Sequence, residues 1–223
     1  MNERVSVYRG KSPVLLIAPH AAPKDDYNTG IITEEMCRLL NCNAVINRGW
    51  QRSKDYDYDK EQADCNNVTH MIDVVEDEFL RPIIGLKNEI IRQYHDCHIF
   101  FIHGMIARNN VDIVLGHGAG TPNSFSCLGW RRNLMYYILE DLSLNVWGEK
   151  ANGLYSGWKN QNMNQYFRKH KLQSNVQSMQ IEISKELRTD KGMSELTAEF
   201  IATAVKNYLK YDSFIKNVNV REI

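Results

Sequence analysis

The chain lacks several features that would assign it to a class at once. It has no apolar run of 18 residues, so the sequence predicts no membrane-spanning helix. Its five cysteines include no C-x-x-C pair, which argues against a disulfide framework and against a thiolate zinc site. Lys plus Arg and Asp plus Glu number 27 each, so no net charge favours nucleic acid or a membrane surface. We therefore expect a small-molecule substrate, with the oligomeric state left open.

Motifs of common enzyme classes are also missing. No G-x-S-x-G element occurs, which disfavours a serine hydrolase. The glycine-rich stretch GHGAG at 116–120 has neither the spacing of a dinucleotide-binding loop nor the Lys-Ser/Thr ending of a phosphate-binding loop. The N-terminal stretch MNERVSVYRGKS has no apolar signal-peptide core, so we expect a cytoplasmic protein.

Short apolar runs alternate with longer amphipathic ones along the 223 residues. We expect strands at 14–18, 43–47, 98–102, 111–115 and 177–183, and helices at 29–40, 72–94, 128–142, 161–170 and 194–208. Pro82 is a potential break in the second helix, and Ser194 is the expected N-cap of the last. This alternation predicts a single α/β domain over 1–223, with three layers (α/β/α) and a mixed, largely parallel sheet.

Histidines follow three of the expected strands. His20, His103 and His117 each come at or just after a strand end. Ligands of open α/β sheets bind at the carboxyl ends of the strands, so we expect all three histidines along one edge.

A metal site is the chemistry that this edge suggests. Catalytic zinc usually takes three His, Asp or Glu ligands and keeps one position for water. His20 and Asp25, from one strand-to-helix loop, together with His103 would supply three ligands. Glu182 is a carboxylate inside an otherwise apolar strand, which suits a general base beside a metal.

Each of these residues also has a simpler structural explanation. A lone histidine at a strand end is more often a hydrogen-bonded structural residue than a ligand. Asp25 and Asp26 are also typical turn or cap residues before the helix at 29–40, and Glu182 could face outward at a sheet edge. The joint placement of these residues at strand ends favours the metal site.

Five short motifs, in this order and spacing from about residue 13 to 190, resemble the N-formylglutamate amidohydrolase family, whose members are zinc-dependent and have a zinc-carboxypeptidase-like fold. They are Pro19-His20, Asp64-Cys65-Asn66-Asn67, Ile102-His103-Gly104-Met105, Asp112-Ile113-Val114-Leu115-Gly116 and Gln180-Ile181-Glu182-Ile183. The resemblance implies that His20, Asp25 and His103 bind Zn²⁺ and that Glu182 activates a water. The related phage poly-γ-glutamate hydrolases have an acidic ligand five positions after the histidine, which favours Asp25 over Asp26.

The chain departs from the family at the residue expected to bind a substrate carboxylate or the scissile carbonyl. Asn67 stands where the family has arginine, so we expect Arg48, Arg52, Arg108 or Asn66 to take that role. Asp112 and His117 are expected to hydrogen-bond the ligand imidazoles, although Asp112 is equally suited to cap a strand. The sequence thus predicts a zinc-dependent amidohydrolase that cleaves a small acylated amino acid such as N-formylglutamate. The alternatives are a γ-glutamyl or peptide hydrolase of the same fold and a non-catalytic small-molecule-binding relative.

Overall fold

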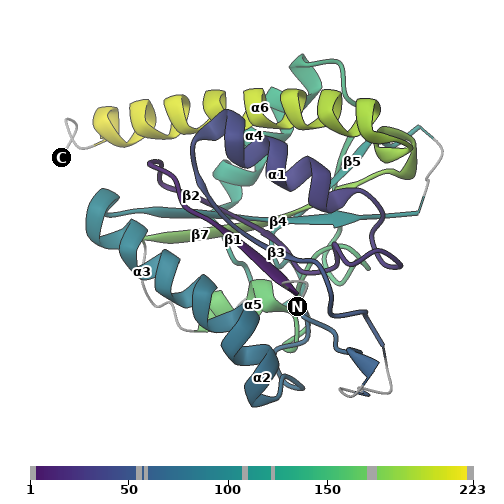
Figure 1. The fold of residues 1–223 in the computed structure, drawn as a ribbon. Coiled ribbons are helices and arrows are strands. Elements are labelled where there is room, and N and C mark those ends of the chain that lie inside the picture. Colours follow the sequence, from purple (N-terminus) through teal and green to yellow (C-terminus); the bar gives the residue numbers. More distant parts are fainter. Residues whose placement is uncertain are drawn as a thin grey trace.

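A seven-stranded sheet forms the centre of the computed structural model, which describes residues 4–53, 57, 60–106, 110–121, 124–169 and 175–219 (Figure 1). Its strands are β1 (Val5–Tyr8), β2 (Val14–Ala18), β3 (Asn43–Asn47), β4 (Cys97–Gly104), β5 (Ile113–Gly116), β6 (Val146–Gly148) and β7 (Val176–Ile183). They lie in the order β1-β3-β2-β4-β7-β5-β6. The four central strands, β3, β2, β4 and β7, are parallel, while β1 and β5 run antiparallel to their neighbours β3 and β7. The sheet is therefore mixed and largely parallel.

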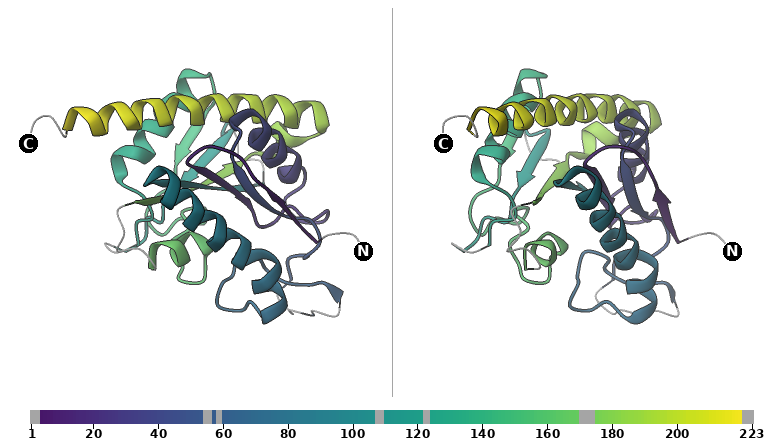
Figure 2. Two further views of the ribbon diagram at one scale, coloured as in Figure 1. Left: turned by 60° about the vertical axis from the view of Figure 1, so that its left-hand side comes forward. Right: turned by 90° about the vertical axis from the view of Figure 1, so that its left-hand side faces the viewer.

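Helices cover both faces of the sheet, which gives three layers (Figures 1 and 2). One face carries α1 (Thr29–Leu40), α4 (Gly129–Asp141) and α6 (Lys191–Asn219), whose apolar side chains join one core cluster. The other carries α3 (Arg81–Tyr94) and α5 (Met163–Lys169), which form a second cluster. Every residue of β2, β3 and β7 is buried, as a strand covered on both faces requires.

The apolar pattern predicted most helices and strands, and the predicted and observed elements differ mainly at their first and last residues. The strands at 14–18 and 43–47 and the helix at 29–40 have the predicted bounds. The last helix begins before Ser194, because the Asp190 carboxylate accepts the Met193 N–H at 2.9 Å and so caps the helix. Ser194 is inside the helix, where its hydroxyl donates to the Asp190 carbonyl. The prediction of Ser194 as the N-cap was therefore wrong.

The segment predicted as one helix from residue 72 to 94 changes its winding before Pro82 rather than breaking there. It consists of α2 (Asp73–Val75), the π-helical η2 (Glu76–Leu80) and α3, in which Pro82 lies in the first turn. Proline has no N–H to donate to the preceding turn, and here that turn is wound as a π-helix, so the helical segment continues through Pro82. No helix in the described part of the chain is long and apolar enough to cross a membrane.

The direction of β5 overturns one prediction. Because β5 runs antiparallel to β7, its carboxyl end lies beside Gln180 and its amino end beside Ile183. His117, which follows β5, therefore does not share an edge with His20 and His103. Asp112, which precedes β5, lies at the edge that those two histidines occupy, and its carbonyl accepts the Ser184 N–H.

Candidate metal centre

Two histidines meet at the carboxyl ends of neighbouring parallel strands. His20 comes two residues after β2, and His103 is the penultimate residue of β4. The β2–β4 pairing places both at the same edge, with ring centroids 5.0 Å apart. Both residues are buried, with 5% and 3% of their surface exposed. The sequence predicted that these two histidines lie at the same edge of the sheet.

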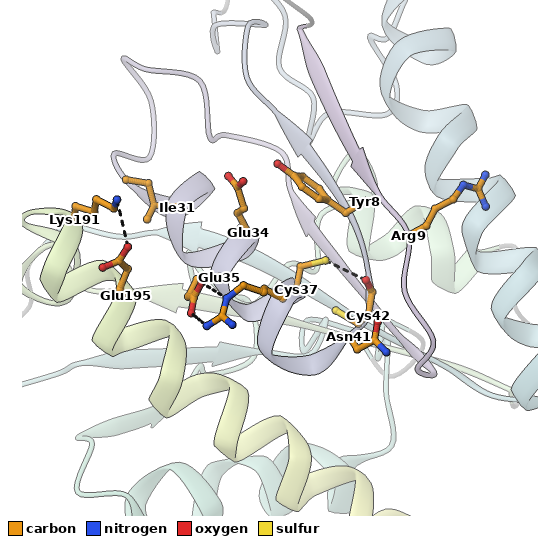
Figure 3. Close-up of a pocket in the computed structure, with 11 residues that line it drawn as sticks. Tyr8, Arg9, Ile31, Glu34, Glu35, Cys37, Asn41, Cys42, Lys191 and Glu195 are labelled. Atoms are coloured by element: carbon orange, nitrogen blue, oxygen red, sulfur yellow. Dashed lines mark hydrogen bonds and ion pairs between the residues drawn. The ribbon is translucent and has the colours of Figure 1, made fainter.

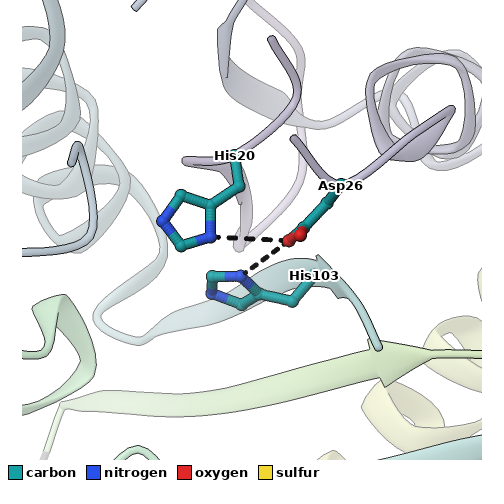
Figure 4. A group of neighbouring side chains, drawn as sticks. All are labelled: His20, Asp26 and His103. Carbon is teal, nitrogen blue, oxygen red and sulfur yellow. Dashed lines mark hydrogen bonds and ion pairs between the residues drawn. The ribbon is translucent and has the colours of Figure 1, made fainter. Parts of the chain in front are cut away.

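Asp26 completes the group, because the loop after β2 turns back on itself. The Asp26 N–H donates to the His20 carbonyl at 2.9 Å, which brings the aspartate over the histidine. Its Oδ2 atom lies 3.4 Å from His20 Nδ1 and 3.3 Å from His103 Nδ1 (Figure 4). Oδ2 also accepts the Gly104 N–H at 3.0 Å, which fixes the carboxylate against the end of β4.

Asp25, the residue chosen from sequence, is directed elsewhere. Its Oδ2 accepts the backbone N–H of Arg52 at 2.7 Å, so it holds the segment that follows β3. The structure thus brings Asp26, and not Asp25, to the two histidines. The backbone turn decides between these adjacent residues, and residue spacing alone could not show that turn.

The separations of the carboxylate oxygen from the two imidazole nitrogens suit a metal ion. Donors bound to a tetrahedral zinc at about 2.0–2.1 Å lie about 3.3–3.4 Å from one another. The separations of Asp26 Oδ2 from the two Nδ1 atoms have these values and are long for N–H···O hydrogen bonds. His20, Asp26 and His103 are also the described residues that form a group able to hold a metal.

The charge around His20 favours a cation at this position. Burial lowers the pKa of His20, but the hydrogen bonds and charges of Asp26 and Asp64 outweigh it and raise this pKa to about 9. Burial raises the pKa of the Asp26 carboxyl. His103 and His20 stabilise the carboxylate more strongly, and this pKa therefore lies well below its usual range. The pocket therefore stabilises positive charge between these side chains, as a cation site requires.

Asp64 orients His20 from the other side of the ring. His20 Nε2 lies 2.8 Å from Asp64 Oδ1, and Asp64 also accepts the backbone N–H of Asn66. When Nε2 carries the proton and donates it to Asp64, the Nδ1 lone pair is available to bind a metal ion. Metal-binding histidines commonly have such a carboxylate partner. Asp64 is part of the sequence motif Asp64-Cys65-Asn66-Asn67, but the sequence alone predicts no role for its carboxylate.

Glu182 lies beside this group on the next strand. It is paired with His103 across β4 and β7, so both side chains leave the sheet on the same face. Glu182 is 5% exposed and accepts a hydrogen bond from the Gln180 amide. Burial raises the pKa of the Glu182 carboxyl, and the Asp26 charge adds to this rise while His103 opposes it. A raised pKa suits a general base working near neutral pH.

The four residues predicted to bind substrate have different positions. Arg52 lies at the group, with Nη1 3.3 Å from His20 Nδ1 and Nη2 3.7 Å from Asp26 Oδ1. Arg48 instead pairs with Glu34 and has no recorded contact with the two histidines. Arg108 falls outside the described residues.

Two other predicted residues have local partners of their own. The Asp112 carboxylate accepts the Asn145 N–H, which is the strand-capping alternative for this residue. His117 packs against Phe125, and burial lowers its pKa to about 4. Neither residue has a recorded contact with His20, Asp26 or His103, so a role for them as partners of the ligand imidazoles lacks support.

A cavity of about 290 Å³ adjoins the group through Asp64. Asn66, the fourth predicted substrate residue, is in its wall, and the bridge between Asn67 and Asn162 joins two of its loops. The wall also includes Lys159, an exposed cation. Its full lining is Asp64, Asn66, Asn67, Leu154, Gly157, Trp158, Lys159, Gln161 and Asn162. Its size is close to the lower end of the range for small-molecule sites.

A larger pocket of about 620 Å³ lies against α1 and the start of α6 (Figure 3). Its charged side chains largely satisfy one another, as in the pairs Arg38–Glu35 and Lys191–Glu195. None of the candidate site residues lines it. Of these two, the smaller cavity beside Asp64 is therefore the better candidate for a substrate site.

Comparisons with known proteins agree with the geometry at the level of the fold. No protein-family model and no curated protein sequence match the chain. An N-formylglutamate amidohydrolase from Ralstonia eutropha is similar over 96% of this chain and 99% of its own, with TM-score 0.62 and 13% identity. A bacteriophage poly-γ-glutamate hydrolase is similar over 95% of this chain and 92% of its own, with TM-score 0.56 and 17% identity. A metallo-carboxypeptidase from Burkholderia cenocepacia is similar over 95% of this chain and 66% of its own, with TM-score 0.56 and 12% identity. The chain therefore has the carboxypeptidase-like hydrolase fold that its sequence motifs predicted.

Proposed function

We propose that this protein is a zinc-dependent amidohydrolase that cleaves the amide bond of a small acylated amino acid. The observation that carries the proposal is the placement of Asp26 Oδ2 within 3.3–3.4 Å of two histidine Nδ1 atoms. A buried carboxylate, Glu182, lies on the adjoining strand. Structural neighbours that include an amidohydrolase and a metallo-carboxypeptidase support the same reaction class.

His20, Asp26 and His103 would hold the zinc. Bound zinc lowers the pKa of a coordinated water and polarises the substrate carbonyl. Glu182 takes the proton from the attacking water and delivers it to the leaving amine. Gln180 holds the Glu182 carboxylate in place through its side-chain amide.

Arg52 is the cation suited to the developing oxyanion. Its side chain is 47% exposed, while its backbone N–H is fixed by Asp25. The guanidinium can therefore move from the carboxylate of Asp26 to a substrate oxygen while its anchor stays in place. In this arrangement Asp25 serves the reaction by holding Arg52 and not by binding metal.

The substrate's own carboxylate is assigned to the cavity beside Asp64. Asp64 is engaged by His20, so its negative charge is largely compensated. Lys159, for which the described residues provide no ion pair, supplies a positive charge, and the asparagine amides supply hydrogen bonds to a polar amino-acid backbone. This cation takes the place of the arginine that Asn67 replaces.

Metal content and a substrate panel test the proposal. Protein purified without chelator should hold about one zinc per chain, as expected for a mononuclear site. The panel consists of formyl, acetyl and γ-glutamyl amino acids. Hydrolysis of the formyl or acetyl compounds supports the proposal, and hydrolysis of the γ-glutamyl compounds alone changes the substrate class. Metal-free protein with a tightly bound small acid would instead favour a non-catalytic binding role.

Replacement of Lys159 should change substrate binding more than turnover. We expect Lys159→Met to raise KM about tenfold for substrates with a free carboxylate, because one charged hydrogen bond is lost. kcat should stay within about twofold, since this contact is made equally before and during the reaction. Steady-state kinetics measure both, with Lys206→Met on α6 as the matched control. An equal rise in KM for a substrate whose carboxylate is replaced by an amide would contradict this role.

A further inference from the structure

A buried arginine behind the candidate metal centre has no role in the proposed reaction. Arg188 is the last residue of η3 (Lys185–Arg188), the short 3-10 helix that follows β7. Only 7% of its surface is exposed. No ion pair with a carboxylate is recorded for it among the described residues. A buried cation without a charged partner is costly and calls for an explanation.

The guanidinium instead binds three backbone carbonyls. Nε donates to the Ile183 carbonyl at 3.2 Å, Nη1 to Tyr27 at 2.7 Å and Nη2 to Met105 at 3.0 Å. These carbonyls come from three separate segments of the chain: the loop after β2, the segment after β4 and the end of β7. A planar guanidinium presents its donors in a fixed fork, so the three contacts fix the relative positions of the segments.

Each of these segments carries a residue of the candidate site. Tyr27 directly follows Asp26, Ile183 directly follows Glu182, and Met105 is two residues after His103. One side chain thus ties together the backbones that present a carboxylate ligand, an imidazole ligand and the general base.

Gly104 leaves the space that this contact needs. A Cβ atom at position 104 would lie 2.5 Å from Arg188 Cζ, well inside van der Waals contact. The Gly104 N–H also binds Asp26 Oδ2, so the strand end is held from both sides. The glycine after His103 is thereby explained by the close approach of Arg188.

The positive charge of Arg188 also affects the two carboxylates of the candidate site. Burial lowers the pKa of the guanidinium, whereas the charges of Asp26 and Glu182 raise it. The arginine therefore stabilises both carboxylates of the site in their ionised form without contacting either.

We propose that Arg188 is a positioning residue, which sets the placement of Asp26 and Glu182 relative to His103 by holding the Tyr27, Met105 and Ile183 carbonyls. The inference rests on the proposed function, since it concerns the same metal centre. It assigns the arginine an effect on metal binding and turnover without contact with metal or substrate.

Two substitutions test this role in different ways. Arg188→Lys keeps the charge but has one nitrogen, which cannot reach three carbonyls at once. Gly104→Ala keeps Arg188 and every backbone N–H but displaces the guanidinium. Arg131→Met is the matched control, because Arg131 is also buried but pairs with Asp212 on α6. For each protein we would measure Zn²⁺ affinity by chelator competition, the visible spectrum of the Co²⁺ form, and kcat and KM.

Both test variants should bind Zn²⁺ about 10–100-fold more weakly than the wild type, the usual cost of losing an outer partner of a metal ligand. The Co²⁺ spectrum should change and kcat should fall with KM within about twofold. Arg131→Met should lower thermal stability but leave affinity and spectrum unchanged. Unchanged affinity and spectrum in folded Arg188→Lys and Gly104→Ala would overturn the role of Arg188 alone. Wild-type protein that takes up neither Zn²⁺ nor Co²⁺ would overturn the proposed function and this inference with it.

Discussion

Asp26→Asn should weaken zinc binding by more than about 100-fold, because loss of an outer partner of a ligand already costs 10–100-fold. The amide has nearly the shape of the carboxylate and can still accept the Gly104 N–H. It lacks the negative charge that faces the two imidazoles at 3.3–3.4 Å. Zinc affinity, measured by chelator competition, should therefore fall while the thermal unfolding temperature confirms that the protein is folded.

The adjacent aspartate provides the control. Asp25→Asn changes the same charge one residue away and keeps an oxygen that can accept the Arg52 N–H. We expect it to bind zinc with wild-type affinity and to lose activity only through Arg52, as a fall in kcat of less than about tenfold. The reverse result, with zinc lost in Asp25→Asn and retained in Asp26→Asn, would restore the sequence-based choice of ligand.

The contrast between these two residues shows where prediction from sequence ended. Buried strands have continuous apolar runs, so the bounds of the strands VLLIA and NAVIN could be predicted correctly from sequence. The position of His20 at the end of the first strand could be predicted from the same pattern. The loop between His20 and Asp26 has no such period. Its turn is closed by two backbone hydrogen bonds, from Asp25 to the Ala22 carbonyl and from Asp26 to the His20 carbonyl, and the residue types do not indicate either one.

Strand direction was a second limit, and it separated His117 from the other histidines. An apolar run predicts that β5 is buried but carries no information on whether it runs parallel to β7. The short edge strands β1 and β6 were missed for a related reason. VSVY and VWG are three or four residues long, with one fully buried position each, and so have too little pattern to recognise.

Arg188 illustrates a third limit, because its role depends on contacts between segments distant in the sequence. Its carbonyl partners at Tyr27 and Met105 lie 161 and 83 residues away. Nothing in KELR distinguishes this arginine from a solvated one. Glu182 could be found because a carboxylate within an apolar strand is itself unusual, whereas an arginine in a short helix is not.

Glu182→Gln should abolish most turnover while the metal centre remains intact. A positioned general base contributes about 10²–10⁴-fold to rate, and an amide cannot accept the proton of the attacking water. The amide can still pair with the side chain of Gln180, so the strand and its packing should be preserved. We therefore expect kcat to fall by about 10²–10⁴-fold on any substrate that the panel identifies, with zinc content equal to that of the wild type.

Glu186→Gln is the matched control for this substitution, because Glu186 lies four residues along the chain and is exposed. It should keep wild-type kcat and zinc content. If Glu182→Gln retained full turnover, another group would have to accept the proton, and the carboxylate at 182 would be structural. If Glu182→Gln lost zinc as well as turnover, the carboxylate would belong to the metal ligands. Either result would exclude Glu182 as the general base. That role requires the Glu182→Gln protein to retain zinc and to lose turnover.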